Sequence, residues 1–210
     1  MTERPSLTRR GLLRGFGTAS VLAGCNRPGS SEAPEGELSP PAGLPTAATA
    51  IGPGPAPLAF RLNGVDKALE VPPSATLLAV LRHELGATGT KEVCDRGACG
   101  ACSVLVDGAV RTACMTLAHD VAGREVTTVE GLAERGQPSA LQRAFVAEDA
   151  LQCGYCTPGM LIACTALMRR SPGPLAPDEI QRAIAGNLCR CGSYPHIIAA
   201  VTSVAGQKGS

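Results

Sequence analysis

The chain has 210 residues and a net charge of +1, and its Lys and Arg residues are scattered along the sequence. It has no Trp, two Tyr and three Phe. A basic patch and an aromatic stacking surface are therefore both lacking, which argues against a nucleic-acid partner. Its ten cysteines are the unusual feature of the composition, and eight of them form two tight groups.

The first 25 residues are predicted to be an export signal. The segment from Thr8 to Arg14, with its Arg9-Arg10 pair, resembles a twin-arginine motif, and the apolar stretch after it is too short to span a bilayer. Leu22-Ala23-Gly24-Cys25 resembles a lipobox, in which Cys25 would be lipidated and would tether the protein to a membrane. The alternatives are a basic disordered tail and a signal that simply contains a cysteine.

Residues 26–57 are predicted to be a disordered, proline-rich tether. They hold eight of the seventeen prolines and almost no large apolar residues. Such a segment cannot bury enough apolar surface to offset the entropy lost on ordering.

The folded part is predicted to be of the α+β class, because strands come first and helices second. Residues 58–134 should form one unit, with two hairpins turning at Asn63-Gly64 and Asp107-Gly108 and with a helix capped by Ser74. Residues 135–206 should form an all-helical unit. The expected strands are Leu58–Leu62, Lys67–Val71, Ser103–Val106, Val110–Cys114 and Glu125–Val129, and the expected helices are 74–85, 139–149, 157–170, 177–186 and 195–205.

The first cysteine group is Cys94, Cys99, Cys102 and Cys114. The first three give a C-x4-C-x2-C pattern, which is the spacing of plant-type ferredoxins, and Cys114 is expected on the following strand. Gly97 and Gly100 allow the loop to curl and to aim backbone N–H groups at sulfur atoms. The pattern favours a [2Fe–2S] cluster, with a structural zinc site as the alternative.

The second group is Cys153, Cys156, Cys189 and Cys191, a C-x2-C and a C-x-C more than thirty residues apart. Pro158 is typical of a helix start, so Cys153 and Cys156 are expected near a helix N-terminus, where the dipole favours thiolate. The alternatives are a second zinc site and a thioredoxin-like redox pair, although the redox pair would leave two cysteines without a role. Cys164 is interpreted as a buried packing residue.

Three segments together resemble the iron–sulfur subunit of the xanthine oxidase family of molybdenum hydroxylases. They are Cys94-Asp-Arg-Gly-Ala-Cys99-Gly-Ala-Cys102, Gln152-Cys-Gly-Tyr-Cys-Thr-Pro-Gly-Met160 and Gly186-Asn-Leu-Cys-Arg-Cys-Gly-Ser-Tyr194. The leader makes the chain most similar to the small subunits of periplasmic aldehyde oxidases. The resemblance implies a β-grasp ferredoxin domain followed by a four-helix bundle, with one [2Fe–2S] cluster in each.

The resemblance also implies a function and partners. The chain would relay electrons from a large molybdenum subunit, which oxidises an aldehyde or N-heterocycle, to an FAD subunit or another acceptor. Gln152 would contact the molybdopterin-type cofactor, so the helical cluster would receive electrons first. No catalytic residue or substrate site is expected in this chain. Clusters are inserted in the cytoplasm, so twin-arginine export of a folded protein to the periplasm is expected. The alternative is a free-standing ferredoxin or zinc-binding module.

Overall fold

The computed structural model describes residues 51–133 and 136–206, which belong to one compact unit. The predicted signal at 1–25, with Arg9, Arg10 and Cys25, and most of the predicted tether lie outside the described residues. In the part that is described, no helix combines the length and the apolar character needed to cross a membrane.

The first hairpin forms as predicted but begins earlier. Strand β1 (Ala56–Leu62) pairs antiparallel with β2 (Val65–Val71), and Asn63 and Gly64 turn the chain with φ values of 53° and 80°. These left-handed conformations are those of a tight hairpin turn that matches the strand twist. The last two residues of the predicted tether, Ala56 and Pro57, are strand residues because they pair with Val71 and Glu70.

The sheet has five strands in the order β2-β1-β5-β3-β4. Strand β3 (Ser103–Val106) pairs antiparallel with β4 (Ala109–Thr112) and with β5 (Glu125–Thr127), and β5 runs parallel to β1. Two predicted strand ends were wrong. Cys114 lies in a short 3₁₀ helix, η2 (Ala113–Met115), and Val129 opens another, η4 (Val129–Leu132); a third, η3 (Ala118–Val121), lies between them.

The helix that follows the first hairpin starts at α2 (Leu77–Ala79) and continues as a π-helical turn, η1 (Val80–Glu84). Its cap is Thr76, whose hydroxyl accepts a hydrogen bond from the Ala79 N–H at 3.2 Å, so the predicted cap at Ser74 was wrong. Residues 75 and 76 are held extended because Leu77 N–H donates to the Thr116 carbonyl and Ala118 N–H donates to the Ala75 carbonyl. The first helical turn can therefore form only after them.

Four further helices follow, close to their predicted ranges: α3 (Ala140–Ala147), α4 (Thr157–Arg170), α5 (Pro177–Ile184) and α6 (Tyr194–Val204). Ser139 caps α3 in a reciprocal pair with Gln142, and prolines stand in the first turn of the other three. Helix starts with such caps or prolines need no long-range contact to form.

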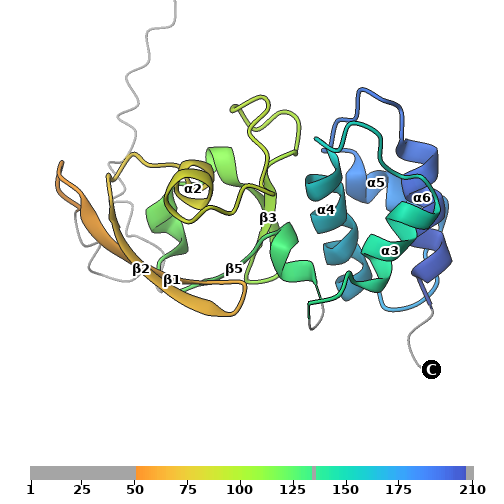
Figure 1. The fold of residues 1–210 in the computed structure, drawn as a ribbon, viewed down its shortest axis with the longest axis horizontal. Helices are drawn as coiled ribbons and strands as arrows, with labels where there is room; N and C mark the ends of the chain where they lie inside the picture. The colour runs from red at the N-terminus through yellow and green to blue at the C-terminus, as the bar shows by residue number, and fades with distance from the viewer. Residues whose placement is uncertain (1–50, 134–135, 207–210) are drawn as a thin grey trace, which may run out of the picture. The chain divides into compact units, whose positions relative to one another are not determined.

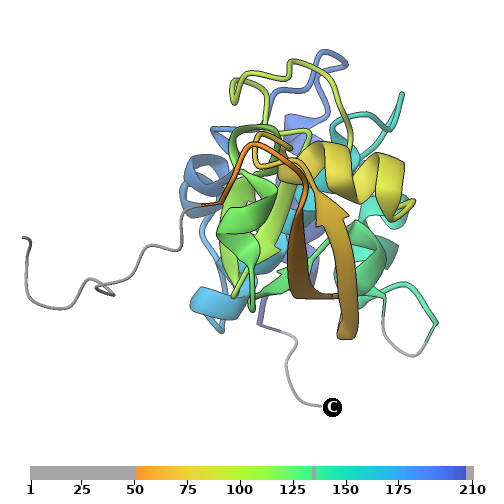
Figure 2. The same ribbon diagram turned by 90° about the vertical axis from the view of Figure 1, so that its left-hand side faces the viewer.

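Two apolar cores lie on opposite faces of β3. Val104 and Val106 point into the core beneath α2, whereas Leu105 points into the core formed by the four later helices. Alternate residues of a strand face opposite sides, so one short strand supplies both cores. Figure 1 shows β3 between α2 and α4, and Figure 2 gives the view along that direction.

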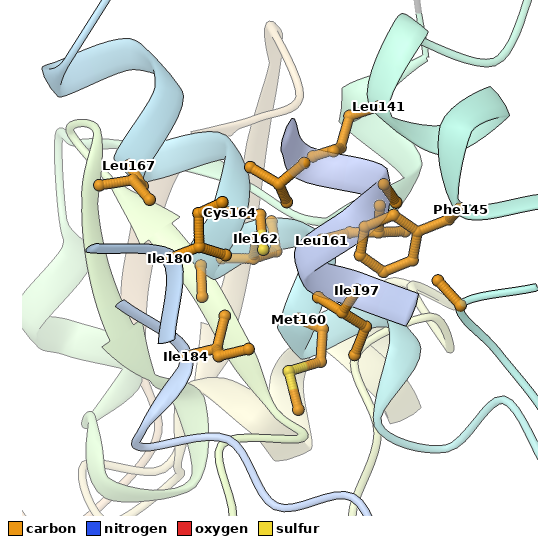
Figure 3. Packing of buried hydrophobic residues seen from close by; sticks show 14 of the residues in the cluster. Leu141, Phe145, Met160, Leu161, Ile162, Cys164, Leu167, Ile180, Ile184 and Ile197 are labelled. Carbon is orange, nitrogen blue, oxygen red and sulfur yellow. The ribbon is translucent and has the colours of Figure 1, made fainter. Parts of the chain in front are cut away.

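Helix α4 is apolar on most of its surface because it packs between β3 and the other helices. Figure 3 shows its buried side chains meeting Ile180 and Ile184 of α5, Ile197 of α6 and Phe145 of α3. The sheet part and the helical part thus share packing and hold the loops between their elements in fixed relative positions.

Candidate metal centre

The loop between η1 and β3 carries three cysteines of the first group and leads to Cys114 on η2. Asp95, Gly97 and Gly100 have left-handed backbones, with φ of 49°, 72° and 68°, so the loop curls back on itself. The curl aims the Gly97 N–H at the Cys114 sulfur, 3.3 Å away. A backbone donor pointed at a sulfur stabilises negative charge there.

The thiols of the first group contact one another in pairs. Cys94 lies close enough to Cys99, and Cys102 to Cys114 and Cys99, for the thiols to influence one another. Backbone hydrogen bonds, above all from Arg96, lower the pKa of the Cys94 thiol to about 7, and the Cys99 thiol adds to the effect. Burial raises the pKa of Cys102 to about 12. The group thus combines a readily ionised thiol with a buried one.

The second group gathers at the N-terminal ends of two helices. Cys156 is the N-cap of α4, and Cys189 and Cys191 lie in the turn that leads into α6. Tyr194 closes this turn, because its hydroxyl accepts from the Cys189 N–H at 2.8 Å and donates to the Asn187 carbonyl at 3.1 Å. Positive ends of helix dipoles favour thiolate and other anionic groups.

Cysteines from both segments of the second group meet. Cys156 lies close enough to Cys189, and Cys153 to Cys191, for the thiols of each pair to interact. Burial raises the pKa of Cys156 to about 12. Burial also acts to raise the pKa of Cys189, but the nearby Ser193 backbone and side chain and the Cys156 thiol outweigh it and bring the pKa to about 7.

All nine described cysteines are free thiols. Over residues 51–133 and 136–206, no three or more His, Cys, Asp or Glu side chains gather as the ligands of a metal ion. The cysteines instead form the pairwise contacts given above. Sulfur ligands, a backbone N–H aimed at Cys114 and helix N-termini beside Cys156 and Cys189 fit the demands of an anionic iron–sulfur cluster.

The two cysteine loops touch directly, which the sequence did not indicate. Leu188 N–H donates to the Cys99 carbonyl at 2.9 Å, and the Asn187 side-chain amide donates to the Gly100 carbonyl at 2.9 Å. Asn187 is buried, and a Cβ at Gly159 would collide with the Gly100 carbonyl oxygen. In Figures 1 and 2 these loops lie at the same end of the molecule.

Gln152 and Cys164, two further residues considered in the sequence analysis, lie in contrasting environments. Gln152 and Cys153 are exposed, and Cys153 helps line a surface hollow of about 390 Å³ together with Arg82, Lys91 and Tyr155. Cys164 is completely buried in α4, and burial raises its pKa to about 12, which confirms its interpretation as a packing residue.

Comparison with known proteins gives two family matches in succession. A 2Fe-2S iron-sulfur cluster binding domain matches residues 60–133, which contain the first cysteine group. A [2Fe-2S] binding domain matches residues 128–202, which contain the second. Both parts of the described fold are therefore iron–sulfur-binding domains by their sequences.

Whole proteins are also similar. The aldehyde oxidoreductase iron-sulfur-binding subunit PaoA of Escherichia coli O157:H7 is 39% identical over 216 residues, covering 96% of this chain and 90% of that protein. The nicotinate dehydrogenase small FeS subunit of Eubacterium barkeri is 45% identical over 142 residues, covering 68% of this chain and 90% of that protein. The structure of quinoline 2-oxidoreductase from Pseudomonas putida 86 matches with a TM-score of 0.69 and 40% identity, over 72% of this chain and 93% of that one.

Identity at this level over nearly the whole chain, with the two domain matches in order, leaves one conclusion. The chain belongs to the iron–sulfur subunits of the xanthine oxidase family of molybdenum hydroxylases, and it is a component of a molybdenum-containing oxidoreductase.

Proposed function

We propose that this chain is a one-electron relay that holds two [2Fe–2S] clusters. When bound, each cluster accepts and releases one electron, and the protein supplies the ligands and the electrostatic surroundings. The observation that carries the proposal is the pairing of eight cysteines into two separate groups, each with a thiol of pKa about 7. We infer that the sheet part is a β-grasp ferredoxin domain and that α3–α6 form a four-helix bundle.

The proposed ligands are the two groups in full. Loop 94–102 and η2 supply the first, and the starts of α4 and α6 supply the second. One set consists of Cys94, Cys99, Cys102 and Cys114, and the other of Cys153, Cys156, Cys189 and Cys191. The Gly97 N–H and the two helix N-termini would hold the negative charge of the bound centres, which keeps their reduced forms accessible.

We propose partners of two kinds, a large subunit with a molybdopterin-type cofactor and an FAD subunit. An aldehyde as the substrate class of the complex is supported by the length of the match. The aldehyde oxidoreductase subunit aligns with 96% of this chain, whereas the nicotinate dehydrogenase subunit aligns with 68%. An aldehyde-oxidising complex is therefore the first to test.

The helical part is the proposed contact with the molybdenum subunit. In the first group Cys99, Cys102 and Cys114 are buried, whereas Cys153 in the second is exposed beside exposed Gln152. A partner cofactor can therefore approach the second group closely, with Gln152 as its contact. Electrons would leave from the ferredoxin side.

The test of this orientation uses the purified complex and Gln152→Ala. Stopped-flow reduction by substrate should slow for the cluster of the second group, with both clusters still assembled. Substitution of Ala98 in the first cysteine loop is the matched comparison, and it should slow only the transfer of electrons to the FAD subunit or other acceptor. If Gln152→Ala leaves substrate-driven reduction unchanged while the Ala98 variant abolishes it, the proposed order of the clusters is reversed.

The identity of the bound centres has its own test. Purified chain should contain about four iron atoms and four acid-labile sulfides, since each of two [2Fe–2S] centres has two of each. It should also co-purify with a large molybdenum protein. Stoichiometric zinc without labile sulfide would instead identify a zinc-binding module, and clusters on a chain that purifies alone from its native source would identify a free ferredoxin.

A further inference from the structure

Ser193 stands at the start of α6 but does not cap that helix. It is the N-cap residue, with φ of −70°, and its side chain makes no capping hydrogen bond. The hydroxyl N-caps of the other α-helices behave differently: Thr76 accepts from Ala79 N–H at α2, and Ser139 accepts from Gln142 N–H at α3. Serine is favoured at an N-cap mainly because it makes that bond. The Ser193 hydroxyl does not make it, so its orientation needs another explanation.

The Ser193 hydroxyl is also buried without a partner. The residue is 1% exposed, and its Oγ forms no hydrogen bond with any atom of the described residues. Leaving a hydroxyl buried and unpaired is unfavourable, and such groups in native proteins usually serve a group that completes the site. Ser103, the buried serine beside Cys102, is satisfied instead, because its hydroxyl donates to the Gly100 carbonyl at 2.7 Å.

The Ser193 hydroxyl influences the thiol of Cys189. Both the backbone and the hydroxyl of Ser193 act on the Cys189 sulfur and lower its pKa, although the hydroxyl does not reach full hydrogen-bond geometry with the thiol. The buried and unpaired hydroxyl thus lies in the turn that carries Cys189 and Cys191, close enough to the Cys189 sulfur to influence it. The Ser193 hydroxyl would find a hydrogen-bond acceptor there if the sulfur carried more negative charge than a thiol does.

Resting on the proposed function, we propose that Ser193 donates a hydrogen bond from its hydroxyl to sulfur in the cluster held by the second cysteine group, and that this bond raises the reduction potential of that cluster. Reduction adds one negative charge to the cluster. A donor aimed at its sulfur atoms stabilises the reduced form more than the oxidised form. Ser193 is a positioning and tuning residue and touches no substrate.

The test is Ser193→Ala in the full chain, with each cluster titrated against potential and followed by EPR. At a fixed solution potential near the midpoint, the ratio of reduced to oxidised cluster in the second group should fall on the order of 3- to 10-fold, the effect of one hydrogen bond. A tenfold change corresponds to about 59 mV in a one-electron couple. The signal of the first group should not move.

Two comparisons separate this effect from a structural one. Ser103→Ala removes a buried serine whose hydroxyl is already bonded to Gly100, so it should leave the potential of the second cluster unchanged. Ser193→Thr keeps the hydroxyl and should keep the potential. Since Ser193 does not cap α6, the purified Ser193→Ala protein should contain as much iron and labile sulfide as the parent and give the same far-UV circular dichroism spectrum.

A second readout addresses the bond itself. Pulsed ENDOR of the reduced second cluster should show an exchangeable proton that disappears in Ser193→Ala. An unchanged potential together with an unchanged proton signal would overturn the proposal, as would an equal shift of both clusters. A parent protein without labile sulfide would overturn the proposed function, and this inference with it, and the iron and sulfide analysis distinguishes that failure from the others.

Discussion

At the scale of single residues, the cysteines divide into those arranged for a cofactor and one that serves packing. A backbone donor lies beside Cys114 and helix N-termini lie beside the second group, whereas Cys164 is completely buried in the apolar core of the helices. The same residue type thus takes two roles, and the difference lies in which polar groups its sulfur meets.

We expect Cys94→Ser and Cys189→Ser each to abolish a different signal in the EPR spectrum of the reduced protein. The reason is that the two groups lie in unlike surroundings and bind through separate sets of ligands. The matched control is Cys164→Ala, which should keep both signals and the full iron content. Loss of both signals from either serine variant, in protein shown to be folded, would contradict two independent sites.

At the scale of elements, the start of α3 is the clearest local determinant of stability. Ser139 N–H donates to the Gln142 side chain at 2.7 Å, and Gln142 N–H donates back to the Ser139 hydroxyl at 3.3 Å. This reciprocal pair satisfies two backbone donors that a helix start otherwise leaves open.

We expect Ser139→Ala to lower the free energy of unfolding by about 1 kcal/mol, the usual effect of losing an N-cap. Urea denaturation followed by circular dichroism measures it. Ser193→Ala in the same purified protein is the matched control, because that N-cap serine makes no capping bond. Equal losses in the two variants would mean that the hydrogen bonds at α3 contribute nothing beyond the presence of a serine.

Also at this scale, Gly159 lets α4 approach the first cysteine loop. A Cβ at this position would collide with the Gly100 carbonyl oxygen, which also accepts from Asn187. We expect Gly159→Ala to cost about 1–3 kcal/mol of stability, as overpacking in a tight site does. Gly186→Ala is the control, since no atom lies within 4 Å of a Cβ built there and its φ is ordinary. Thermal or denaturant unfolding measures the stability of both variants. Equal stability of the two would show that the first cysteine loop can move away from α4.

At the scale of the whole molecule, the sheet part and the helical part behave as one unit. Leu105 of β3 packs among the helices while its neighbours in sequence pack under α2, and the cysteine loops are joined by hydrogen bonds from Asn187 and Leu188. Shared packing of this kind lets one mutation near the contact affect both groups.

A final prediction concerns the residues before the described fold. We propose that the leader directs export of the folded protein through the twin-arginine route, and that Cys25 is lipidated. Substituting Arg9 and Arg10 by Lys should leave the protein in the cytoplasm with its clusters assembled, as measured by fractionation and EPR. An unchanged periplasmic yield would contradict the proposal. Mass spectrometry of the mature N-terminus tests the lipid on Cys25 separately.

Much of the fold and of the site could be predicted because the relevant signals are local. Asn63-Gly64 and Asp107-Gly108 accept left-handed conformations at little cost, so both hairpins follow from neighbouring residues. Prolines and Ser139 mark helix starts for the same reason. Cysteine spacing is equally local within the loop of Cys94, Cys99 and Cys102 and within each of the pairs Cys153/Cys156 and Cys189/Cys191, whereas the meeting of those two pairs depends on the tertiary fold.

What only the tertiary structure decided depends on groups far apart in the chain. The helix begins after Thr76 and not at Ser74, because residues 116–118 hold residues 75 and 76 extended. Cys114 lies in a 3₁₀ turn, and Asn187 reaches Gly100 across 87 positions of sequence. The unused capping hydroxyl of Ser193 is likewise invisible in the sequence, where a serine before a helix predicts a cap. Sequence alone predicted which cysteines are the candidate cluster ligands, because residue type and spacing are local. The structure decided how the two cysteine loops meet, because a buried hydrogen bond or a missing Cβ acquires its meaning from the atoms packed against it.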